Sequence, residues 1–267
     1  MRLATTLTAI AITTVSGCSF GNARYKETRT INRTSYDAMP LHVRSKNGGI
    51  EVERSRDEGV VIVAHIRART QERLDEVEIV ADDLGDGVFE VYAIWPDNRR
   101  KSSEGVSYEI TYPYTEDVTL ATSNGSLRIG EFGGDADLRT SNGRITVNGH
   151  DGDVYADSSN GSINLYEITG EVEADTSNGR IHVELTPDNP GPVSLDTSNG
   201  AISLEVGEAF EGELEADTSN GRVRVEGTVQ GRIHSIRKSY VRLALGDAPH
   251  RSVLDTSNGS VTIRIRD

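Results

Sequence analysis

Apolar and polar positions alternate in short runs from Thr119 to the C-terminus, and a recurrent polar turn interrupts them. The turn reads Thr-Ser-Asn-Gly or a close variant, and two branched or aliphatic residues follow each copy two positions apart, as at Ile181 and Val183. Alternation with a period of two is typical of a strand with one buried face. Together with the high glycine content, 27 residues, the pattern predicts many short strands rather than a helical bundle.

The turns recur at nearly constant spacing, which is the signature of a repeat architecture. Their asparagines are 18 residues apart over the first four copies and then 21 apart over two steps, with a last copy near the C-terminus: Asn124, Asn142, Asn160, Asn178, Asn199, Asn220 and Asn258. Between the last two copies, Lys238 and Ser239 fit the frame in place of Asn-Gly. The spacing therefore predicts serial coils, one of them degenerate.

Two architectures use such turns. Asn-Gly between alternating runs fits an antiparallel meander of hairpins. Stacked coils explain in addition why Thr, Ser and usually Asp are repeated, because equivalent residues lie about 4.8 Å apart and form side-chain ladders. We expect the Asn to adopt a left-handed conformation and the Gly to permit the bend. Since parallel connections are overwhelmingly right-handed, the predicted fold is an all-β, right-handed parallel β-helix or β-solenoid.

The part before Thr119 is strand-rich in a less regular way. Asn47-Gly48-Gly49-Ile50 resembles an outlying copy of the turn, and residues 71–78 read as one helical turn. Alternation predicts strands at 41–43, 50–52, 60–64, 77–79 and 88–94. We therefore divide the chain into a signal peptide (1–17), a flexible tether (18–36), a strand-rich N-terminal cap (37–118) and the solenoid (119–267).

The N-terminus has the features of a secretory signal. Arg2 precedes a short apolar core over residues 3–12, which is too short to span a bilayer, and Val15-Ser-Gly-Cys18 follows it. This stretch resembles the lipobox of bacterial lipoproteins, which implies that Cys18 becomes the lipidated, palmitate-bearing N-terminus. A plain secretory signal cleaved nearby is the alternative. Ser19 after the cysteine resembles outer-membrane sorting, so we expect a cell-envelope protein anchored by lipid in the outer membrane.

Charge and residue content narrow the function classes. Lys and Arg number 28 against 42 Asp and Glu, and the net charge of −14 opposes binding to nucleic acid and to anionic lipid. The single cysteine, Cys18, excludes an internal disulfide and a multi-cysteine metal site. The six histidines are scattered, and Gly-x-Ser-x-Gly, His-Glu-x-x-His and phosphate-loop motifs are absent from the sequence. We therefore expect no catalytic residues, no metal site and no enzyme activity.

An aspartate precedes most copies of the turn: Asp157, Asp175, Asp196, Asp217 and Asp255. Carboxylates stacked at this spacing repel each other unless they are splayed into water, paired with Arg, protonated or bridged by a cation. We expect solvent-splayed side chains and no cofactor, with Ca²⁺ on this ladder as the alternative.

The degenerate coil gathers positive charge in an otherwise acidic chain. Such a departure from the local rule is where function tends to lie. We expect a ligand-binding surface for an acidic polysaccharide or a lipopolysaccharide phosphate there, formed by Arg232, His234, Arg237, Lys238, Tyr240 and Arg242. Neutral drift of one coil is the alternative.

The lipobox, the stretch YEITYPYTEDVTLATSNGSLRIG and the serial Ser-Asn-Gly coils together resemble the putative-adhesin family of bacterial β-strand-repeat envelope proteins, over residues 37–267. The resemblance implies a β-helix-like fold and no established biochemical activity. We expect a non-catalytic, lipid-anchored envelope protein that serves as an adhesin or as a binding or scaffold module, with an envelope glycan or another envelope protein as partner. The alternative is a β-helix polysaccharide lyase or hydrolase that acts on acidic glycans.

Overall fold

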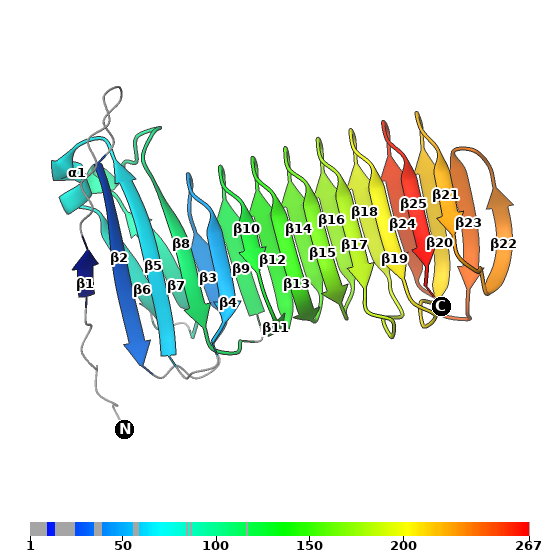
Figure 1. Cartoon of the computed structure of the whole chain (residues 1–267), viewed down its shortest axis with the longest axis horizontal. Coiled ribbons are helices and arrows are strands. Elements are labelled where there is room, and N and C mark those ends of the chain that lie inside the picture. Colours follow the sequence, from blue (N-terminus) through cyan, green and yellow to red (C-terminus); the bar gives the residue numbers. More distant parts are fainter. Residues whose placement is uncertain are drawn as a thin grey trace.

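The computed structural model describes residues 10–13, 25–34, 39–55, 59–83, 85, 87–115 and 117–266. Two long sheets face each other across an apolar interior and form an elongated body (Figure 1). Of the described strands, sheet A holds 13 and sheet B holds 12. The all-β class and the parallel, solenoid-like stacking expected from the repeat are therefore present.

Sheet A runs in the spatial order β1 (Ile10–Thr13), β2 (Tyr25–Thr34), β5 (Gly59–Ala68), β8 (Gly105–Tyr112), β4 (Ile50–Arg54), β10 (Leu127–Ile129), β13 (Ile145–Asp151), β15 (Ile163–Ile168), β17 (Ile181–Leu185), β19 (Ile202–Val206), β25 (Val261–Ile265) and β21 (Val223–Glu226), with β11 (Phe132–Gly133) beside β13. Sheet B runs β22 (Gly231–Ile236), β23 (Tyr240–Leu245), β20 (Gly212–Thr218), β24 (Arg251–Thr256), β18 (Val193–Thr197), β16 (Val172–Thr176), β14 (Val154–Ser158), β12 (Asp135–Thr140), β9 (Asp117–Thr122), β3 (Leu41–Arg44), β7 (Phe89–Ile94) and β6 (Glu78–Asp83).

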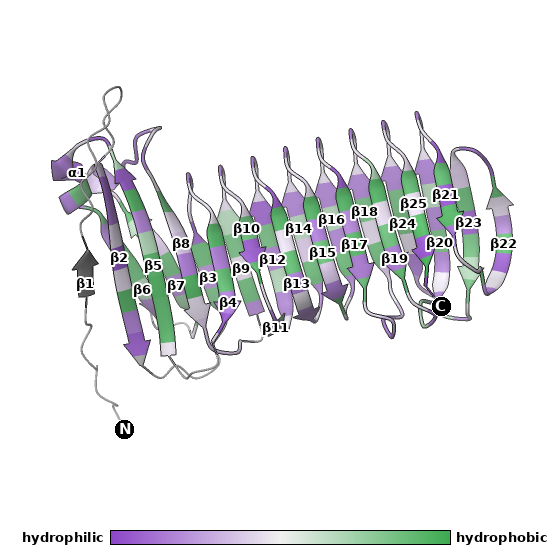
Figure 2. Ribbon diagram, viewed as in Figure 1, coloured by the Kyte–Doolittle hydropathy of each residue, from purple (hydrophilic) through white to green (hydrophobic). Residues whose placement is uncertain are grey.

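Each regular coil consists of a strand of sheet B, a Ser-Asn-Gly turn and a strand of sheet A. Successive coils pair in parallel and in register, so that Ile145, Ile163, Ile181 and Ile202 lie side by side in sheet A. This parallel pairing excludes the antiparallel meander across each Asn-Gly. The alternating side chains fill the space between the sheets, and the apolar interior appears as a repeated band on the strands (Figure 2).

The turn asparagines form one hydrogen-bonded column. Nδ2 of each Asn donates to Oδ1 of the Asn in the preceding coil, at 2.9 Å from Asn142 to Asn124 and 3.0 Å from Asn178 to Asn160. The column begins at Asn47, which accepts from Asn124 at 2.8 Å, so the outlying copy of the turn belongs to the stack. The predicted side-chain ladder is therefore confirmed.

The reason expected for Asn and Gly at this turn was wrong. Among the described residues, positive φ outside glycine occurs at Asp97, Asn98 and Glu167, and the turn glycines also lack positive φ. Close approach of the stacked backbones explains the glycine instead. A Cβ on Gly179 would lie 1.9 Å from the carbonyl oxygen of Gly161, a distance that no side chain tolerates.

A buried hydroxyl column lies beside the turn glycines. Thr176 is fully buried, and its Oγ1 donates to the carbonyl oxygen of Gly161 at 3.0 Å. Thr197 makes the same bond to Gly179 at 3.0 Å. Because a buried carbonyl needs a partner, this bond explains why the turn repeats Thr as well as Asn-Gly.

The final coil does not stack where the serial order predicts. The coil of β24 and β25 lies between the β18–β19 coil and the β20–β21 coil. Asn258 therefore separates Asn199 from Asn220 in the column, with 3.0 Å to each. Adjacent coils in the sequence are thus not always adjacent in space.

The predicted degenerate coil is an antiparallel hairpin instead. Strand β23 pairs antiparallel with both β20 and β22, at the end of sheet B. The frame that placed Lys238 and Ser239 at a stacked turn is therefore wrong. Alternating positions satisfy parallel and antiparallel pairing equally well, so the pattern of β22 and β23 did not distinguish the two.

The N-terminal strands combine both kinds of pairing. Strands β2, β5 and β8 pair antiparallel, whereas β3 and β4 pair in parallel with β9 and β10. The predicted strands and helical turn of this part are found, the latter as α1 (Gln71–Asp75), with a second short helix η1 (Pro96–Asn98). Residues 25–34, expected within the tether, form β2, and residues 10–13, expected within the signal peptide, form β1, which pairs antiparallel with β2. No helix in the described ranges is long and apolar enough to cross a membrane.

Candidate functional site

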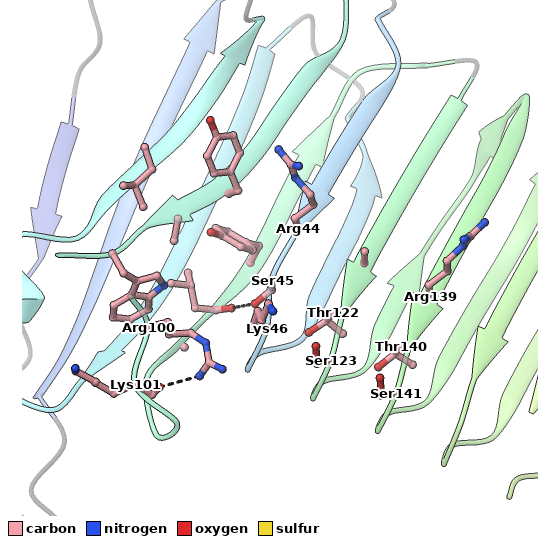
Figure 3. Close-up of a pocket in the computed structure, with 18 of the residues that line it drawn as sticks. Arg44, Ser45, Lys46, Arg100, Lys101, Thr122, Ser123, Arg139, Thr140 and Ser141 are labelled. Carbon is pink, nitrogen blue, oxygen red and sulfur yellow. Dashed lines mark hydrogen bonds between the residues drawn. The ribbon is translucent and has the colours of Figure 1, made fainter. Parts of the chain in front are cut away.

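A groove of about 1040 Å³ opens beside the first turns of the stack. Strands β3, β7, β8, β9 and β12 and the segment 95–105 line it, so it lies where the N-terminal strands meet the regular coils. Figure 3 shows Arg100 and Lys101 on one side of Lys46 and the hydroxyls of Thr122 and Thr140 on the other. We call it the basic groove, after its charged lining: Arg44, Lys46, Arg99, Arg100, Lys101 and Arg139.

Positive charge in the basic groove contrasts with the chain as a whole. Asp157 is the one acidic residue among the described lining residues, whereas the net charge of the chain is −14. Two of the cations replace repeat residues, because Arg139 pairs in register with Asp157 and Lys46 occupies the Ser position of the first turn. The repeat is thus altered from acidic or neutral to basic at this end.

Half of these cations are already engaged. Arg44 bonds Glu90 at 2.9 Å and lies 4.9 Å from the centre of the Tyr92 ring. Arg139 bonds Asp137 at 2.7 Å, and Arg100 donates to the carbonyl of Glu104 at 2.8 Å.

The remaining cations are free to contact a ligand. Lys46, Arg99 and Lys101 are exposed, and their side chains form no ion pair with any residue that the structure describes. Such cations can bind an anion without first breaking an internal pair.

A buried ion pair holds the segment that carries Arg99 to Lys101. Glu104 is fully buried, and its carboxylate accepts from Nε of Arg73 at 2.7 Å and from the backbone N–H of Lys101 at 2.8 Å. Burial opposes ionisation of Glu104, but these hydrogen bonds outweigh it and lower the pKa of the carboxyl group. The groove cations therefore project from a backbone that an internal charge pair fixes.

The floor of the basic groove contains a polar group without a partner. Tyr108 is 1% exposed and lines the groove, and its hydroxyl has no hydrogen-bond partner among the described residues. Burial raises the pKa of this phenol, so the hydroxyl stays protonated and able to donate. Nε of Arg100 is likewise buried without a partner. Buried donors are normally satisfied, so these two atoms are exceptions within the described residues.

The basic surface expected from the sequence lies at the opposite end of the molecule. All six of its residues lie on the β22–β23 hairpin, which the structure brings together as one exposed element (Figure 1). Arg242 is bound to Glu213 at 2.6 Å, and Ile233 and Ile236 are more than half exposed. Among the described residues, no buried side-chain donor of the hairpin lacks a partner. Its role in binding stays a prediction.

The aspartates form the expected ladder, but their order follows the stacking of the coils, in which the last coil lies between two earlier ones. In register, Asp157 is followed by Asp175, Asp196, Asp255 and Asp217. Burial, and then the neighbouring carboxylates, raise the pKa values of the middle three: Asp175, Asp196 and Asp255. Within the described ranges, no group of three or more His, Cys, Asp or Glu is arranged to hold a metal ion. Cys18 lies outside the described residues.

The sequence did not predict the basic groove, although two of its basic features can be found in the sequence. Arg99-Arg100-Lys101 forms the densest basic run in the chain, and Lys46 replaces the usual Ser of the turn. These residues are more than fifty positions apart, and only the stacking of coils brings them to one surface.

The family comparison gives a match over most of the chain. The family model described as Toastrack DUF4097 matches residues 31–264. A search of curated proteins gives no significant match.

Solved structures of bacterial proteins resemble the chain distantly. A "putative lipid binding protein" from Parabacteroides distasonis is 14% identical, with a TM-score of 0.39 and coverage of 91% of this chain and 97% of that one. A "putative adhesin" from Bacteroides fragilis is 11% identical, with a TM-score of 0.37 and coverage of 90% and 97%. A "putative cell adhesion protein" from Clostridium sporogenes is 11% identical, with a TM-score of 0.32 and coverage of 91% and 100%. These likenesses are too distant to carry a functional conclusion.

Proposed function

The chain belongs to the Toastrack DUF4097 family, and we propose that it is a non-catalytic binding module of the cell envelope whose basic groove holds an anionic ligand. The observation that carries this proposal is the combination of exposed, unpaired cations with the buried, unpaired hydroxyl of Tyr108 at one groove. Cations supply attraction to phosphate, sulfate or carboxylate oxygens, and a buried donor supplies a directed hydrogen bond.

The groove suits charged ligands rather than apolar ones. Lys46 from the first turn of the stack and Arg99 and Lys101 from the segment 95–105 can approach an anion from two separate parts of the chain. The hydroxyls of Thr122 and Thr140 are already bound to turn carbonyls. Trp95 adds an apolar wall, and it is the single tryptophan of the chain. Its fluorescence therefore reports on this groove alone.

The test is a titration with two soluble anions, inositol hexakisphosphate and polygalacturonate. Affinity is measured by calorimetry, and Trp95 fluorescence shows whether the groove is occupied. We expect binding that weakens with salt and falls at least tenfold in the groove variant, Lys46→Ala with Arg99→Ala and Lys101→Ala. Each of these side chains is exposed, so the melting temperature should be unchanged.

A matched control removes the same charge from the other end of the molecule. The hairpin variant carries Arg232→Ala, Arg237→Ala and Lys238→Ala, all at exposed positions of the β22–β23 hairpin. It should bind both anions as the wild type does. Loss of binding in the hairpin variant with retention in the groove variant would refute the groove and favour the surface expected from the sequence.

We further propose that the module is anchored by lipid at Cys18 in the outer membrane. The support is the sequence Val15-Ser-Gly-Cys18 after a short apolar core, with Ser19 behind it. The wild-type chain should fractionate with membranes, and Cys18→Ser should release it into the soluble fraction. A wild-type chain found in the periplasm or medium without detergent would exclude the anchor.

The finer architecture is part of the same proposal. We take the solenoid as right-handed because parallel connections nearly always are. The antiparallel strands before the regular coils serve as its N-terminal cap, since a solenoid needs atypical terminal repeats to close its open ends. A crystal structure tests both statements directly, and left-handed winding would refute the first.

A further inference from the structure

We propose that the basic groove docks on the anionic phospholipid headgroups of the membrane that holds the Cys18 anchor, so that the solenoid projects from the bilayer by its N-terminal end. This inference rests on the proposed function, both for the anion-binding groove and for the anchor. It names the source of the anion as a membrane surface rather than a soluble ligand.

The length of the tether limits how far the folded part can lie from the anchor. Six residues, 19–24, separate Cys18 from Tyr25, the first residue of β2. At about 3.5 Å per residue, Tyr25 lies within roughly 25 Å of the lipid-bearing residue. The end of the molecule where β2 begins is therefore held close to the headgroups.

A chain of hydrogen bonds connects this end of β2 to the basic groove. Tyr25 pairs in register with Ala68, and the next residue, Arg69, donates its backbone N–H to the carboxylate of Glu104 at 3.3 Å. The same carboxylate holds the backbone of Lys101 at 2.8 Å. The carbonyl of Glu104 accepts from Nδ2 of Asn47 at 2.9 Å, beside Lys46. One buried residue thus joins the start of the folded chain to the groove cations.

The exposed groups at this end suit a headgroup layer. In addition to Lys46, Arg99 and Lys101, Arg69 is an exposed cation without an ion pair in the described structure, and its backbone N–H bonds Glu104. Tyr25 is 44% exposed, and tyrosine is favoured at the membrane–water interface. Acidic residues also lie at this end, in α1, directly after it and in η1: Glu72, Asp75, Glu76 and Asp97. The attraction to headgroups is therefore confined to the groove side.

The charge distribution sets the orientation only together with the anchor, because the β22–β23 hairpin at the opposite end also carries exposed cations, Arg232, Arg237 and Lys238. The aspartate ladder begins beyond Arg139 and continues away from the N-terminal end, at Asp157 and the coils that follow. An anionic surface repels these coils and attracts the groove. End-on docking is therefore the arrangement that satisfies both, although the net charge of the chain alone predicts no affinity for anionic lipid.

Vesicle binding of the Cys18→Ser chain, which lacks the lipid, tests docking apart from anchoring. The vesicles contain phosphatidylcholine alone or phosphatidylcholine mixed with phosphatidylglycerol. We expect binding to the mixed vesicles only, with at least a tenfold loss of partitioning in the groove variant and no loss in the hairpin variant. A brominated phosphatidylglycerol should quench Trp95 fluorescence, because Trp95 lines the groove.

The outcomes separate the two proposals. Binding of inositol hexakisphosphate or polygalacturonate in the groove, without vesicle binding, would overturn membrane docking and leave the proposed function standing. Equal vesicle binding by the groove variant and the wild type, or quenching that is absent on bound vesicles, would also overturn docking. Absence of all binding to soluble anions and vesicles would overturn both. Melting temperatures show that each variant is folded.

Discussion

Asn258 donates a hydrogen bond from Nδ2 to Oδ1 of Asn199 at 3.0 Å, across 59 positions of sequence. Asn220 then donates to Asn258 at 3.0 Å, across 38 positions. The C-terminal coil (β24 and β25) therefore lies inside the stack, between two coils that precede it in the sequence. Residues 207–250, which contain β20 to β23, must therefore leave a space of one coil next to β18 and β19, and β24 and β25 occupy this space.

Engineered disulfides test this order. With Cys18→Ser as background, Asn199→Cys with Asn258→Cys places two cysteines on neighbouring coils, about 4.8 Å apart, which a disulfide can span. Asn199→Cys with Asn220→Cys places them two coils apart, beyond its reach. We expect oxidation to crosslink the first pair and leave the second free, as measured by thiol titration. The reverse result would show serial stacking.

The turn glycines should tolerate no side chain, because their backbones are in close contact. Gly179→Ala would place a Cβ 1.9 Å from the oxygen of Gly161, and we expect it to destabilise the fold by about 3 kcal/mol or more. Gly130→Ala is the matched control, since its Cβ would meet nothing nearer than 4.0 Å. Urea unfolding measures both. Equal stability of the two variants would refute the close-approach explanation.

The aspartate ladder predicts a pH dependence of stability with a definite sign. Burial, and then Asp175 and Asp255, raise the pKa of Asp196 in the folded state. The folded chain then binds more protons than the unfolded chain between about pH 3.9 and the raised pKa, so stability from this group falls as pH rises through that window.

Asp196→Asn should therefore raise the melting temperature at pH 7, and its advantage should shrink as the pH falls toward 4. Asp188→Asn, at an exposed loop position, serves as control and should change little at either pH. High salt should also reduce the advantage, because it screens the carboxylates from each other. A melting temperature lowered at pH 7 would show that the ladder stabilises the fold, as a bridging cation such as Ca²⁺ would cause.

Local alternation and spacing were sufficient to predict the strands of the regular coils, their parallel stacking and the asparagine column, but not β2, which was expected within the tether. They were insufficient for the order of the last coils, because Asp217 and Asp255 precede identical Thr-Ser-Asn-Gly turns and present the same register to a neighbour. Periodicity also placed β22 and β23 in the stack, although they pair antiparallel. A strand's pattern encodes which face is buried, and does not encode its partner.

The candidate site was less predictable than the fold. Arg44, Lys46, Arg100 and Arg139 belong to different elements, and each alone reads as an ordinary surface charge. The unpaired hydroxyl of Tyr108 is visible only once its surroundings are known. The net charge pointed away from anionic ligands, because a sum over the chain does not reveal a local reversal of sign.

The most direct test of the basic groove is Tyr108→Phe, examined by calorimetric titration with inositol hexakisphosphate and by thermal unfolding. Removing a buried hydroxyl that has no partner should raise the melting temperature, whereas losing a hydrogen bond to an anion should weaken binding about tenfold or more. A more stable variant with weaker binding is the result that the ligand-binding account predicts. A more stable variant with unchanged affinity would contradict it, because the hydroxyl in the groove floor would then have no part in binding.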